Sequence, residues 1–193
     1  MIHKLLENTK VVLASASPRR RDLMKMMGVK ALVVPSHADE PDTGEAPRVQ
    51  ALRHARNKAR AVAARVDSHC LVVGADTLVV LDRHLLGKPD STDRASQYLR
   101  LLSGRSHQVY TGICLVYQGR CLQAWEKSSV TFKALSEEEI RLYVETQEPM
   151  DKAGAYGIQG YGAQFITGIK GCYFNVMGFP IHRFYQLCQE LLA

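Results

Sequence analysis

The chain has 193 residues, 46% of them hydrophobic and 23% charged, and its formal net charge is +6 at pH 7. These values are typical of a globular protein with one domain or two small lobes, and they exclude a disordered or fibrous chain. We expect no membrane span, because Asp76 interrupts the best apolar run, Leu71 to Leu81, which is well short of the ~20 residues a span needs.

Cysteine usage and the N-terminal residues indicate a cytoplasmic location. The first ten residues lack the apolar stretch of a secretory signal, and none of the five cysteines has C-x-x-C spacing. We therefore expect a reducing compartment, with neither a disulfide framework nor a zinc knuckle. The excess of basic residues is compatible with nucleic acid, an acidic membrane surface or a phosphorylated small molecule as partner.

Apolar patterning predicts strands and helices that alternate early in the chain. Val11–Ala14 is typical of a buried strand, Ser17 of an N-cap with Pro18 in the first helical turn, and Gly28 of a helix end after Met27. The elements expected next are a strand at Ala31–Pro35, a polar loop at Ser36–Glu45, a helix at Pro47–Val66, a strand at Leu71–Leu81 turning into Leu85–Leu86, a helix at Thr92–Ser103, strands at His107–Tyr117 and Leu122–Phe132, a capped helix at Ser136–Thr146, an irregular glycine-rich segment at Gly154–Gly162, strands at Gln164–Thr167 and Cys172–Val176, and a helix at Ile181–Leu192.

This order predicts an α/β protein with a mixed twisted sheet and flanking helices, in which residues 1–193 form a single domain. In the helix at Pro47–Val66, apolar residues recur at three- and four-residue spacings, which predicts one buried stripe. The stripe comprises Val49, Leu52, Ala55, Ala59, Val62, Ala63 and Val66.

The segment Ser15-Ala-Ser-Pro-Arg-Arg20 is typical of an anion site. A strand that runs directly into a helix presents free backbone N–H groups and the positive end of the helix dipole. Arg19 and Arg20 add charged donors suited to phosphate oxygens. The alternative is a capped surface helix with solvated arginines. The segment is neither a Walker loop nor a dinucleotide fingerprint, since it has no glycines.

Asp76 is the strongest single candidate for a functional residue, because it lies within an apolar strand. A buried carboxylate is costly unless it is hydrogen-bonded, paired or bound to a metal. The alternative is a structural aspartate. Together with Asp76, the acidic pair Asp39-Glu40 offers the oxygen ligands that Mg²⁺ or Mn²⁺ prefers, although acidic loop residues are more often simply solvated.

Two lysines and one glutamine are further candidates for ligand contacts. Lys58 lies at the edge of the apolar stripe, and Lys88 sits on a stiff loop between Gly87 and Pro89. Gln159, in the glycine-rich segment, has both a donor and an acceptor for a base edge. Taken alone, each lysine is more typical of an ordinary surface position, and the alternative for the glycine-rich segment is a tight connection. The histidines show neither a zinc nor a serine hydrolase motif.

Taken in order, these segments resemble the Maf family of nucleoside triphosphate pyrophosphatases, also known as septum-formation inhibitors. The resemblance covers essentially the whole chain. It is carried by Leu13-Ala-Ser-Ala-Ser-Pro-Arg-Arg20, Asp39-Glu40, Asn57-Lys-Ala59, Gly74-Ala-Asp-Thr77, Gly87-Lys-Pro89, Leu102-Ser-Gly104, Tyr110-Thr-Gly112, Asp151–Gly160 and Val176-Met-Gly-Phe-Pro180.

The resemblance implies two lobes around a deep cleft, similar to inosine triphosphatases, and metal-dependent hydrolysis of a nucleoside triphosphate to the monophosphate and pyrophosphate. Asp76 matches the family's proton acceptor, and Arg19, Thr77 and Gln159 match positions that set base preference in the dTTP/UTP branch. The branch similar to methylated-guanosine triphosphatases carries Ser-Asp-Gln at the Asp76 segment, which this chain lacks. A role in excluding non-standard nucleotides from nucleic acids, or in division arrest, is a further implication.

The chemistry of that reaction suits the residues found independently. Attack of water at the α-phosphorus needs charge neutralised on three phosphates, and the expected phosphate-binding set is Ser15, Arg19, Arg20, Lys58 and Lys88. Glu40 and Asp76 are the expected ligands of a divalent cation, Mg²⁺ or Mn²⁺, that lowers the pKa of its bound water.

Two alternatives remain open. One is the same reaction on CTP or on modified nucleotides. The other is a basic module that binds nucleic acid or a division protein, favoured by the basic residues of the helix between Arg48 and Arg65. The lack of aromatic stacking runs and of a DNA-binding motif disfavours it. A homodimer is expected only as the common case for such folds.

Overall fold

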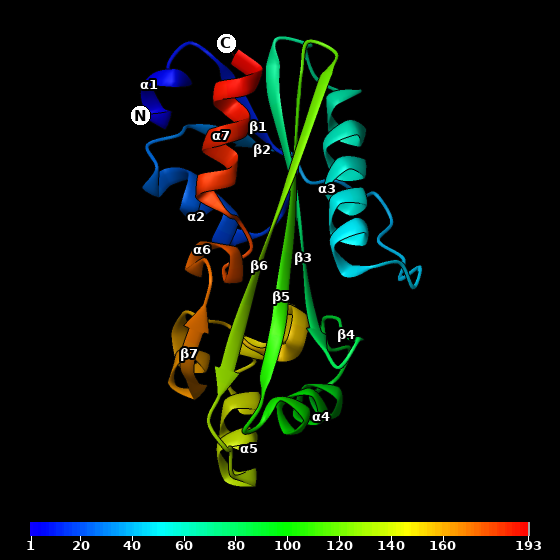
Figure 1. Cartoon of the computed structure of the whole chain (residues 1–193), viewed down its shortest axis with the longest axis vertical. Coiled ribbons are helices and arrows are strands. Elements are labelled where there is room, and N and C mark those ends of the chain that lie inside the picture. Colours follow the sequence, from blue (N-terminus) through cyan, green and yellow to red (C-terminus); the bar gives the residue numbers. More distant parts are fainter. Residues whose placement is uncertain (193) are drawn as a thin grey trace. The chain divides into compact units, whose positions relative to one another are not determined.

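The computed structural model describes residues 1–192. Its helices and strands follow the predicted order closely (Figure 1). They are α1 (Ile2–Leu5), β1 (Lys10–Leu13), α2 (Pro18–Met26), β2 (Ala31–Val33), α3 (Pro47–Ala63), β3 (Cys70–Leu81), β4 (His84–Leu86), α4 (Thr92–Leu102), β5 (Ser106–Tyr117), β6 (Arg120–Phe132), α5 (Glu137–Glu145), the 3₁₀ turns η1 (Glu148–Asp151), η2 (Ala153–Ala155) and η3 (Gly160–Phe165), β7 (Ile166–Lys170), α6 (Tyr173–Val176) and α7 (Ile181–Leu192).

The strands form one mixed sheet in the order β2-β1-β3-β5-β6-β7, with β4 paired to β3. Strand β1 pairs in parallel with β2 and β3, whereas β3–β4 and β6–β7 are antiparallel. Parallel neighbours require crossover connections, and the helices α2 and α3 supply them. The predicted α/β class with a mixed sheet and flanking helices is confirmed.

The chain divides into two compact units, and β3, β5 and β6 contribute to both. The first unit comprises Met1–Asp76, Thr111–Glu126 and the residues from Gly178 onward. Within it, α3 lies on one side of β1 and β3, and α2 and α7 lie on the other (Figure 1). Under α3, a cluster of buried small and β-branched side chains fills the space to the strands. Its members are Val12, Ala14, Ala55, Ala59, Val62, Val72 and Cys114.

The second unit comprises Thr77–Tyr110 and Lys127–Met177. Its core is larger and more aromatic, built from α4, α5 and the inward faces of β5 and β6. Phe132, Tyr156 and His107 meet there edge to face. Helix α5 begins as predicted, since Ser136 and Glu139 form a reciprocal capping box. The expectation of a single domain stays a prediction.

Two local predictions are wrong. Residues 172–176 form the short helix α6 rather than a strand, because its turn directs Asn175 inward, where the amide donates hydrogen bonds to the Val109 carbonyl (3.0 Å) and to Ser128 Oγ (2.9 Å). Strand β7 starts two residues later than predicted, since η3 precedes it. Ser17 occupies the N-cap position of α2 as predicted, although its side chain makes no capping hydrogen bond.

The buried face of α3 also differs from the predicted stripe. Val49 is 41% exposed, whereas Gln50, His54 and Lys58 are buried together with the alanines. The helical period is as predicted, but the buried face is rotated relative to the predicted stripe. Among residues 1–192, no helix is long and apolar enough to cross a membrane.

Candidate functional site

Asp76 lies in the middle of β3 and is the last residue of the segment Met1–Asp76 of the first unit. It is only 5% exposed. Burial by itself raises the pKa of this carboxyl. The hydrogen bond from His54 and the charge of Lys58 outweigh that effect, so the pKa of Asp76 is well below its ordinary value of 3.8. Asp76 is therefore a carboxylate across the physiological pH range.

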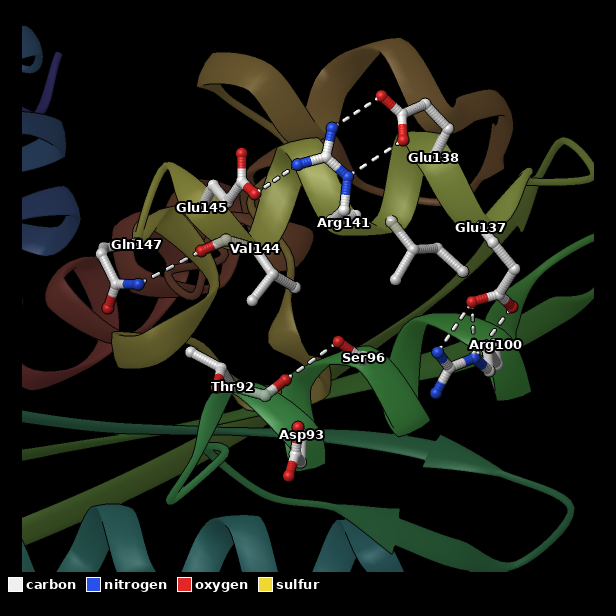
Figure 2. Close-up of a pocket in the computed structure, with 11 residues that line it drawn as sticks. Thr92, Asp93, Ser96, Arg100, Glu137, Glu138, Arg141, Val144, Glu145 and Gln147 are labelled. Atoms are coloured by element: carbon white, nitrogen blue, oxygen red, sulfur yellow. Dashed lines mark hydrogen bonds and ion pairs between the residues drawn. The ribbon is translucent and has the colours of Figure 1, made fainter.

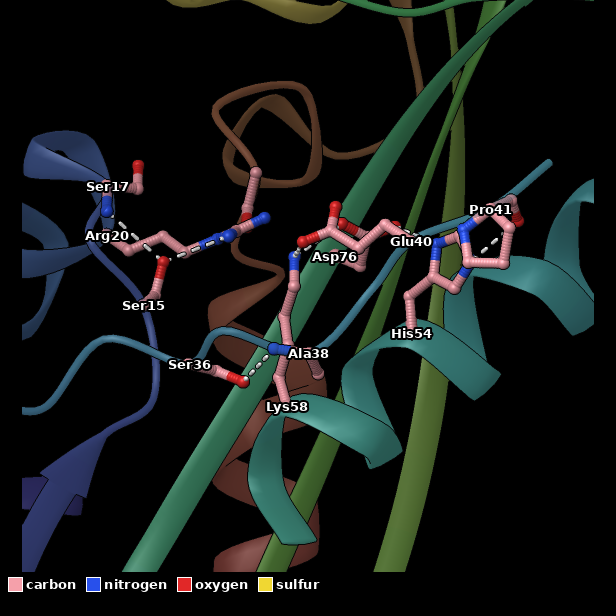
Figure 3. A network of polar contacts seen from close by, with 11 residues as sticks. Ser15, Ser17, Arg20, Ser36, Ala38, Glu40, Pro41, His54, Lys58 and Asp76 are labelled. Carbon is pink, nitrogen blue, oxygen red and sulfur yellow. Dashed lines mark hydrogen bonds and ion pairs between the residues drawn. The ribbon is translucent and has the colours of Figure 1, made fainter. Parts of the chain in front are cut away.

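Both oxygens of Asp76 face nitrogen atoms from α3 (Figure 3). Lys58 Nζ donates to Oδ1 over 2.8 Å, and His54 Nδ1 lies 3.0 Å from Oδ2. The Lys58 ammonium also lies 2.7 Å from Oε1 of Glu40, so it bridges two carboxylates. The second ring nitrogen of His54, Nε2, lies 3.2 Å from the carbonyl oxygen of Pro41, the residue after Glu40.

Glycines in the strands permit this meeting of helix and sheet. A Cβ at Gly74 would lie 2.3 Å from the Ala55 carbonyl oxygen, and one at Gly112 would lie 2.5 Å from the Ala51 carbonyl. Helix α3 therefore packs directly on the backbone of β3 and β5. His54 and Lys58 are four residues apart on that packed face, which places both of them over Asp76.

The predicted anion site lies in the same unit. Ser15 Oγ accepts hydrogen bonds from the Ser17 backbone N–H (3.2 Å) and from Arg20 Nη1 (3.1 Å), and Arg20 Nε donates to the Gly178 carbonyl (2.8 Å) (Figure 3). Burial lowers the pKa of Arg20, while the charge of Asp76 acts in the opposite direction. Arg20 is thus electrostatically linked to Asp76.

The first unit therefore brings together most of the predicted site. Glu40, Lys58 and Asp76 are in contact, and Ser15 and Arg20 are hydrogen-bonded to each other. Arg19 is half-buried in the first turn of α2, and Asp39 is exposed beside Glu40.

Three predicted residues belong to the second unit: Thr77, half-buried in β3, and Lys88 and Gln159, both exposed. Within that unit the loop of Lys88 is joined to the glycine-rich segment, since the Gly154 N–H donates to the Gly87 carbonyl over 3.0 Å. That Lys88 and Gln159 belong to the same site as Asp76 stays a prediction.

The loop that carries Gln159 is held by one carboxylate. Glu148 accepts hydrogen bonds from the backbone N–H groups of Tyr161 (2.9 Å) and Gly162 (3.1 Å), and from the hydroxyl of Tyr143 (2.9 Å). Gly160 has a positive φ of 80°, and a Cβ there would lie 2.4 Å from Glu148 Oε2. This loop conformation therefore needs glycine at position 160.

The residues present fit the predicted cation site, and the structure adds His54 to Glu40 and Asp76. Glu40, His54 and Asp76 each offer one ligand atom, and these atoms all lie within 4.8 Å of one another. Two carboxylate oxygens and an imidazole nitrogen are compatible with a divalent metal. Sequence reasoning missed His54. The available signal was its position four residues before Lys58, on the same helical face as a lysine assigned to the site.

A hollow between α4 and α5 contains none of the predicted site residues (Figure 2). Its two arginines are already paired: Arg100 with Glu137 (2.7 Å), and Arg141 with both Glu138 and Glu145. These ion pairs are about half-exposed or more, as is usual for solvated surface pairs. Its lining has four acidic side chains against these two arginines, so it has no excess of positive charge to attract a phosphate.

Comparison with known proteins gives matches along nearly the whole chain. The family model described as Maf-like protein matches residues 10–191. A curated relative from Koribacter versatilis, named dTTP/UTP pyrophosphatase, is 48% identical and covers 93% of both chains. Relatives of the same name from Moorella thermoacetica and Thermococcus onnurineus are 49% and 48% identical; they cover 96% and 92% of this chain and 94% and 95% of their own.

Likeness to solved structures is weaker. The Staphylococcus aureus Ham1 protein is 16% identical, with a TM-score of 0.46, over 82% of this chain and 80% of its own. A HAM1 protein from Coxiella burnetii is 18% identical, with a TM-score of 0.43, over 64% and 73%.

Proposed function

The chain belongs to the Maf-like protein family, and from that membership we propose that it is a nucleoside triphosphate pyrophosphatase acting on dTTP and UTP. The reaction adds water to the triphosphate and releases the nucleoside monophosphate and pyrophosphate. Three relatives that are 48 to 49% identical bear the name dTTP/UTP pyrophosphatase, which supports both the reaction and the substrates.

The observation that carries the proposal is the buried contact of Asp76 with Lys58 beside the anion site. A carboxylate that is 5% exposed, with one oxygen 2.8 Å from an ammonium, is costly for a purely structural role. Phosphoryl chemistry needs such a fixed carboxylate next to cationic groups.

Phosphate binding is assigned to residues of both units. Ser15, Arg19, Arg20 and Lys58 offer hydroxyl, guanidinium and ammonium donors in the first unit, and Lys88, a residue of the second unit, stays a predicted further donor. The guanidinium of Arg20 is already held in position, because it donates hydrogen bonds to Ser15 Oγ and to the Gly178 carbonyl. A fixed guanidinium loses less conformational entropy when it binds an oxyanion.

Asp76 acts as the proton acceptor for the attacking water. Its lowered pKa makes it a weak base alone, so the water must be made more acidic before the carboxylate can take its proton. Glu40 and Asp76 would hold a divalent cation, Mg²⁺ or Mn²⁺. Such a cation supplies charge neutralisation for the phosphates and a lower pKa for water. As the water oxygen bonds to the α-phosphorus, the bond to the bridging oxygen breaks and pyrophosphate leaves.

Base preference is assigned to Arg19, Thr77 and Gln159. Gln159 suits this role because its amide offers a donor and an acceptor, and it sits on a loop fixed by Glu148. The same reaction on CTP would keep this mechanism and change only the assignment of these three residues.

The test is a pyrophosphate-release assay on UTP, dTTP, CTP and modified nucleoside triphosphates with Mg²⁺ or Mn²⁺. We expect turnover of UTP and dTTP, and its loss in Asp76→Asn. Asp67→Asn is the matched control, because Asp67 is an exposed carboxylate of the same unit. Near-normal turnover by a folded Asp76→Asn variant would overturn the role of Asp76. If the wild type released no pyrophosphate from any nucleotide tested, the proposed function would be overturned.

Nucleic-acid binding is disfavoured because basic side chains of α3 are already paired with carboxylates. Lys58 is buried against Asp76, and Arg53 is paired with Glu45 over 3.1 Å and hydrogen-bonded to Thr43. Two of the basic residues between Arg48 and Arg65 are thus already neutralised. A gel shift with random DNA at low salt should show no complex; a salt-dependent shift would favour the binding module instead.

A further inference from the structure

His54 lies between two oxygen atoms and is only 2% exposed. Its Nε2 lies 3.2 Å from the carbonyl oxygen of Pro41, which can only accept a hydrogen bond. Its Nδ1 lies 3.0 Å from Oδ2 of Asp76. With Nε2 turned toward that carbonyl, the position between Nδ1 and Oδ2 can be occupied either by a proton on Nδ1 or by a cation.

This arrangement is the one in which proteins hold metal-binding histidines. One ring nitrogen donates its N–H to a backbone carbonyl, which fixes the tautomer and aims the other nitrogen at the metal. Here the orienting carbonyl belongs to Pro41 and the neighbouring carboxylate to Glu40, so one loop provides both. The ligand atoms of Glu40, His54 and Asp76 lie within 4.8 Å of one another.

We infer that His54 is a nitrogen ligand of the divalent cation and that it makes the site select Mn²⁺ over Mg²⁺. The inference rests on the proposed function for the presence of a cation at Glu40 and Asp76, and it adds the identity of that cation. Mg²⁺ takes oxygen ligands almost exclusively, whereas imidazole suits the first-row transition ions. A buried imidazole among the carboxylates therefore raises the affinity for Mn²⁺ and Co²⁺ more than that for Mg²⁺.

The ammonium of Lys58 holds the two carboxylates of the site together when no cation is bound. Its ammonium bridges Oε1 of Glu40 and Oδ1 of Asp76 at 2.7 and 2.8 Å, on the side of Asp76 opposite Oδ2. Oδ2 faces His54 and is the carboxylate oxygen available to a cation. A proton on Nδ1 is the competing occupant of that position, and it would make His54 a hydrogen-bond donor to Asp76.

The first experiment distinguishes these two occupants on the wild-type protein without nucleotide. Electron spin echo measurements on bound Mn²⁺ report nitrogen ligands directly through their nuclear coupling. We expect a nitrogen coupling typical of imidazole. Bound Mn²⁺ without that coupling, or no binding of Mn²⁺ at all, would overturn the inference.

The second experiment measures cation affinities by calorimetry for the wild type and two histidine variants. In His54→Leu, the Kd for Mn²⁺ and Co²⁺ should rise about tenfold or more and the nitrogen coupling should vanish, while the Kd for Mg²⁺ changes less than about threefold. His69→Leu is the matched control, because Nδ1 of His69 also lies 3.0 Å from an aspartate, Asp67, but that pair is exposed. Its affinities should equal those of the wild type.

An equal loss of Mg²⁺ and Mn²⁺ affinity in His54→Leu would also overturn the inference. Should that variant not fold, His54→Gln replaces it, and the wild-type spectrum remains decisive. Failure here is separable from failure of the proposed function. Hydrolysis of UTP without a nitrogen coupling removes only the ligand role of His54, and a nitrogen coupling without hydrolysis of any nucleotide overturns the proposed function and leaves the ligand role of His54 in place.

Discussion

Lys58 Nζ donates a hydrogen bond to Oδ1 of Asp76 over 2.8 Å, and the two side chains are only 10% and 7% exposed. Removing one member of such a pair leaves a buried charge without its partner. Lys58→Met should therefore destabilise the fold by roughly 3 kcal/mol. Urea unfolding of this variant measures the loss.

The matched control is Arg53→Met, which removes a more exposed pair with Glu45 and should cost about 1 kcal/mol or less. The double variant Lys58→Met/Asp76→Asn should be more stable than the sum of the single losses, since neither charge is then buried alone. Simple additivity in this cycle would show that Lys58 and Asp76 do not depend on each other.

Gly74→Ala should be strongly destabilising. Its Cβ would lie 2.3 Å from the Ala55 carbonyl oxygen and 2.8 Å from the Ala59 nitrogen, so helix and strand must separate. We expect a loss of about 3 kcal/mol. Gly87→Ala is the control, because a Cβ there meets nothing within 4 Å. Thermal unfolding of both variants measures the difference, and equal melting temperatures would contradict the close packing of α3.

Arg20→Lys should lower kcat/KM for UTP by about tenfold, although it keeps the charge. The guanidinium binds Ser15 Oγ and the Gly178 carbonyl through two different nitrogens, which a single ammonium cannot reproduce. Steady-state kinetics measure this loss. Arg21→Lys tests the same exchange at an exposed neighbour in α2 and should leave kcat/KM unchanged. Unaltered kinetics in Arg20→Lys would remove Arg20 from the phosphate-binding set.

Acid should destabilise the protein through His107. Burial lowers the pKa of His107 to about 4, from an ordinary value of 6.5. Above pH 6.5 the ring is neutral in both folded and unfolded chains. Between pH 6.5 and 4 only the unfolded chain binds the proton, so the free energy of unfolding falls as the pH drops, by about 3 kcal/mol in total.

Urea titrations at pH 7 and pH 4.5 measure this loss, and His107→Gln should flatten it. Asp76 does not obscure the result. Its folded-state pKa is depressed, so its contribution to stability is complete above its ordinary pKa of 3.8 and is lost only at lower pH. An unchanged pH slope in a folded His107→Gln variant would assign the acid sensitivity to other groups.

Short-range patterns were sufficient to predict most of the fold. The apolar run Val11–Ala14, the capping box of Ser136 and Glu139 and the helix end at Gly28 each specify local backbone geometry through a few neighbouring residues. Residues 172–176 were mispredicted because the helical turn there depends on Asn175 reaching Val109 and Ser128, which are distant in sequence. No local pattern contains that information.

For the site, the sequence by itself determined the residue types: a carboxylate inside an apolar strand, an arginine-rich helix start and a lysine at the edge of a helical stripe. Only the tertiary structure decided that His54 belongs with them and that Val49 lies outside the buried face of α3. The reason is the rotation of α3 about its axis, which is set where the glycine backbone of β3 and β5 admits the helix, at Gly74 and Gly112. The periodicity of a helix gives the width of its buried face, whereas the surface it packs against selects which side chains that face contains.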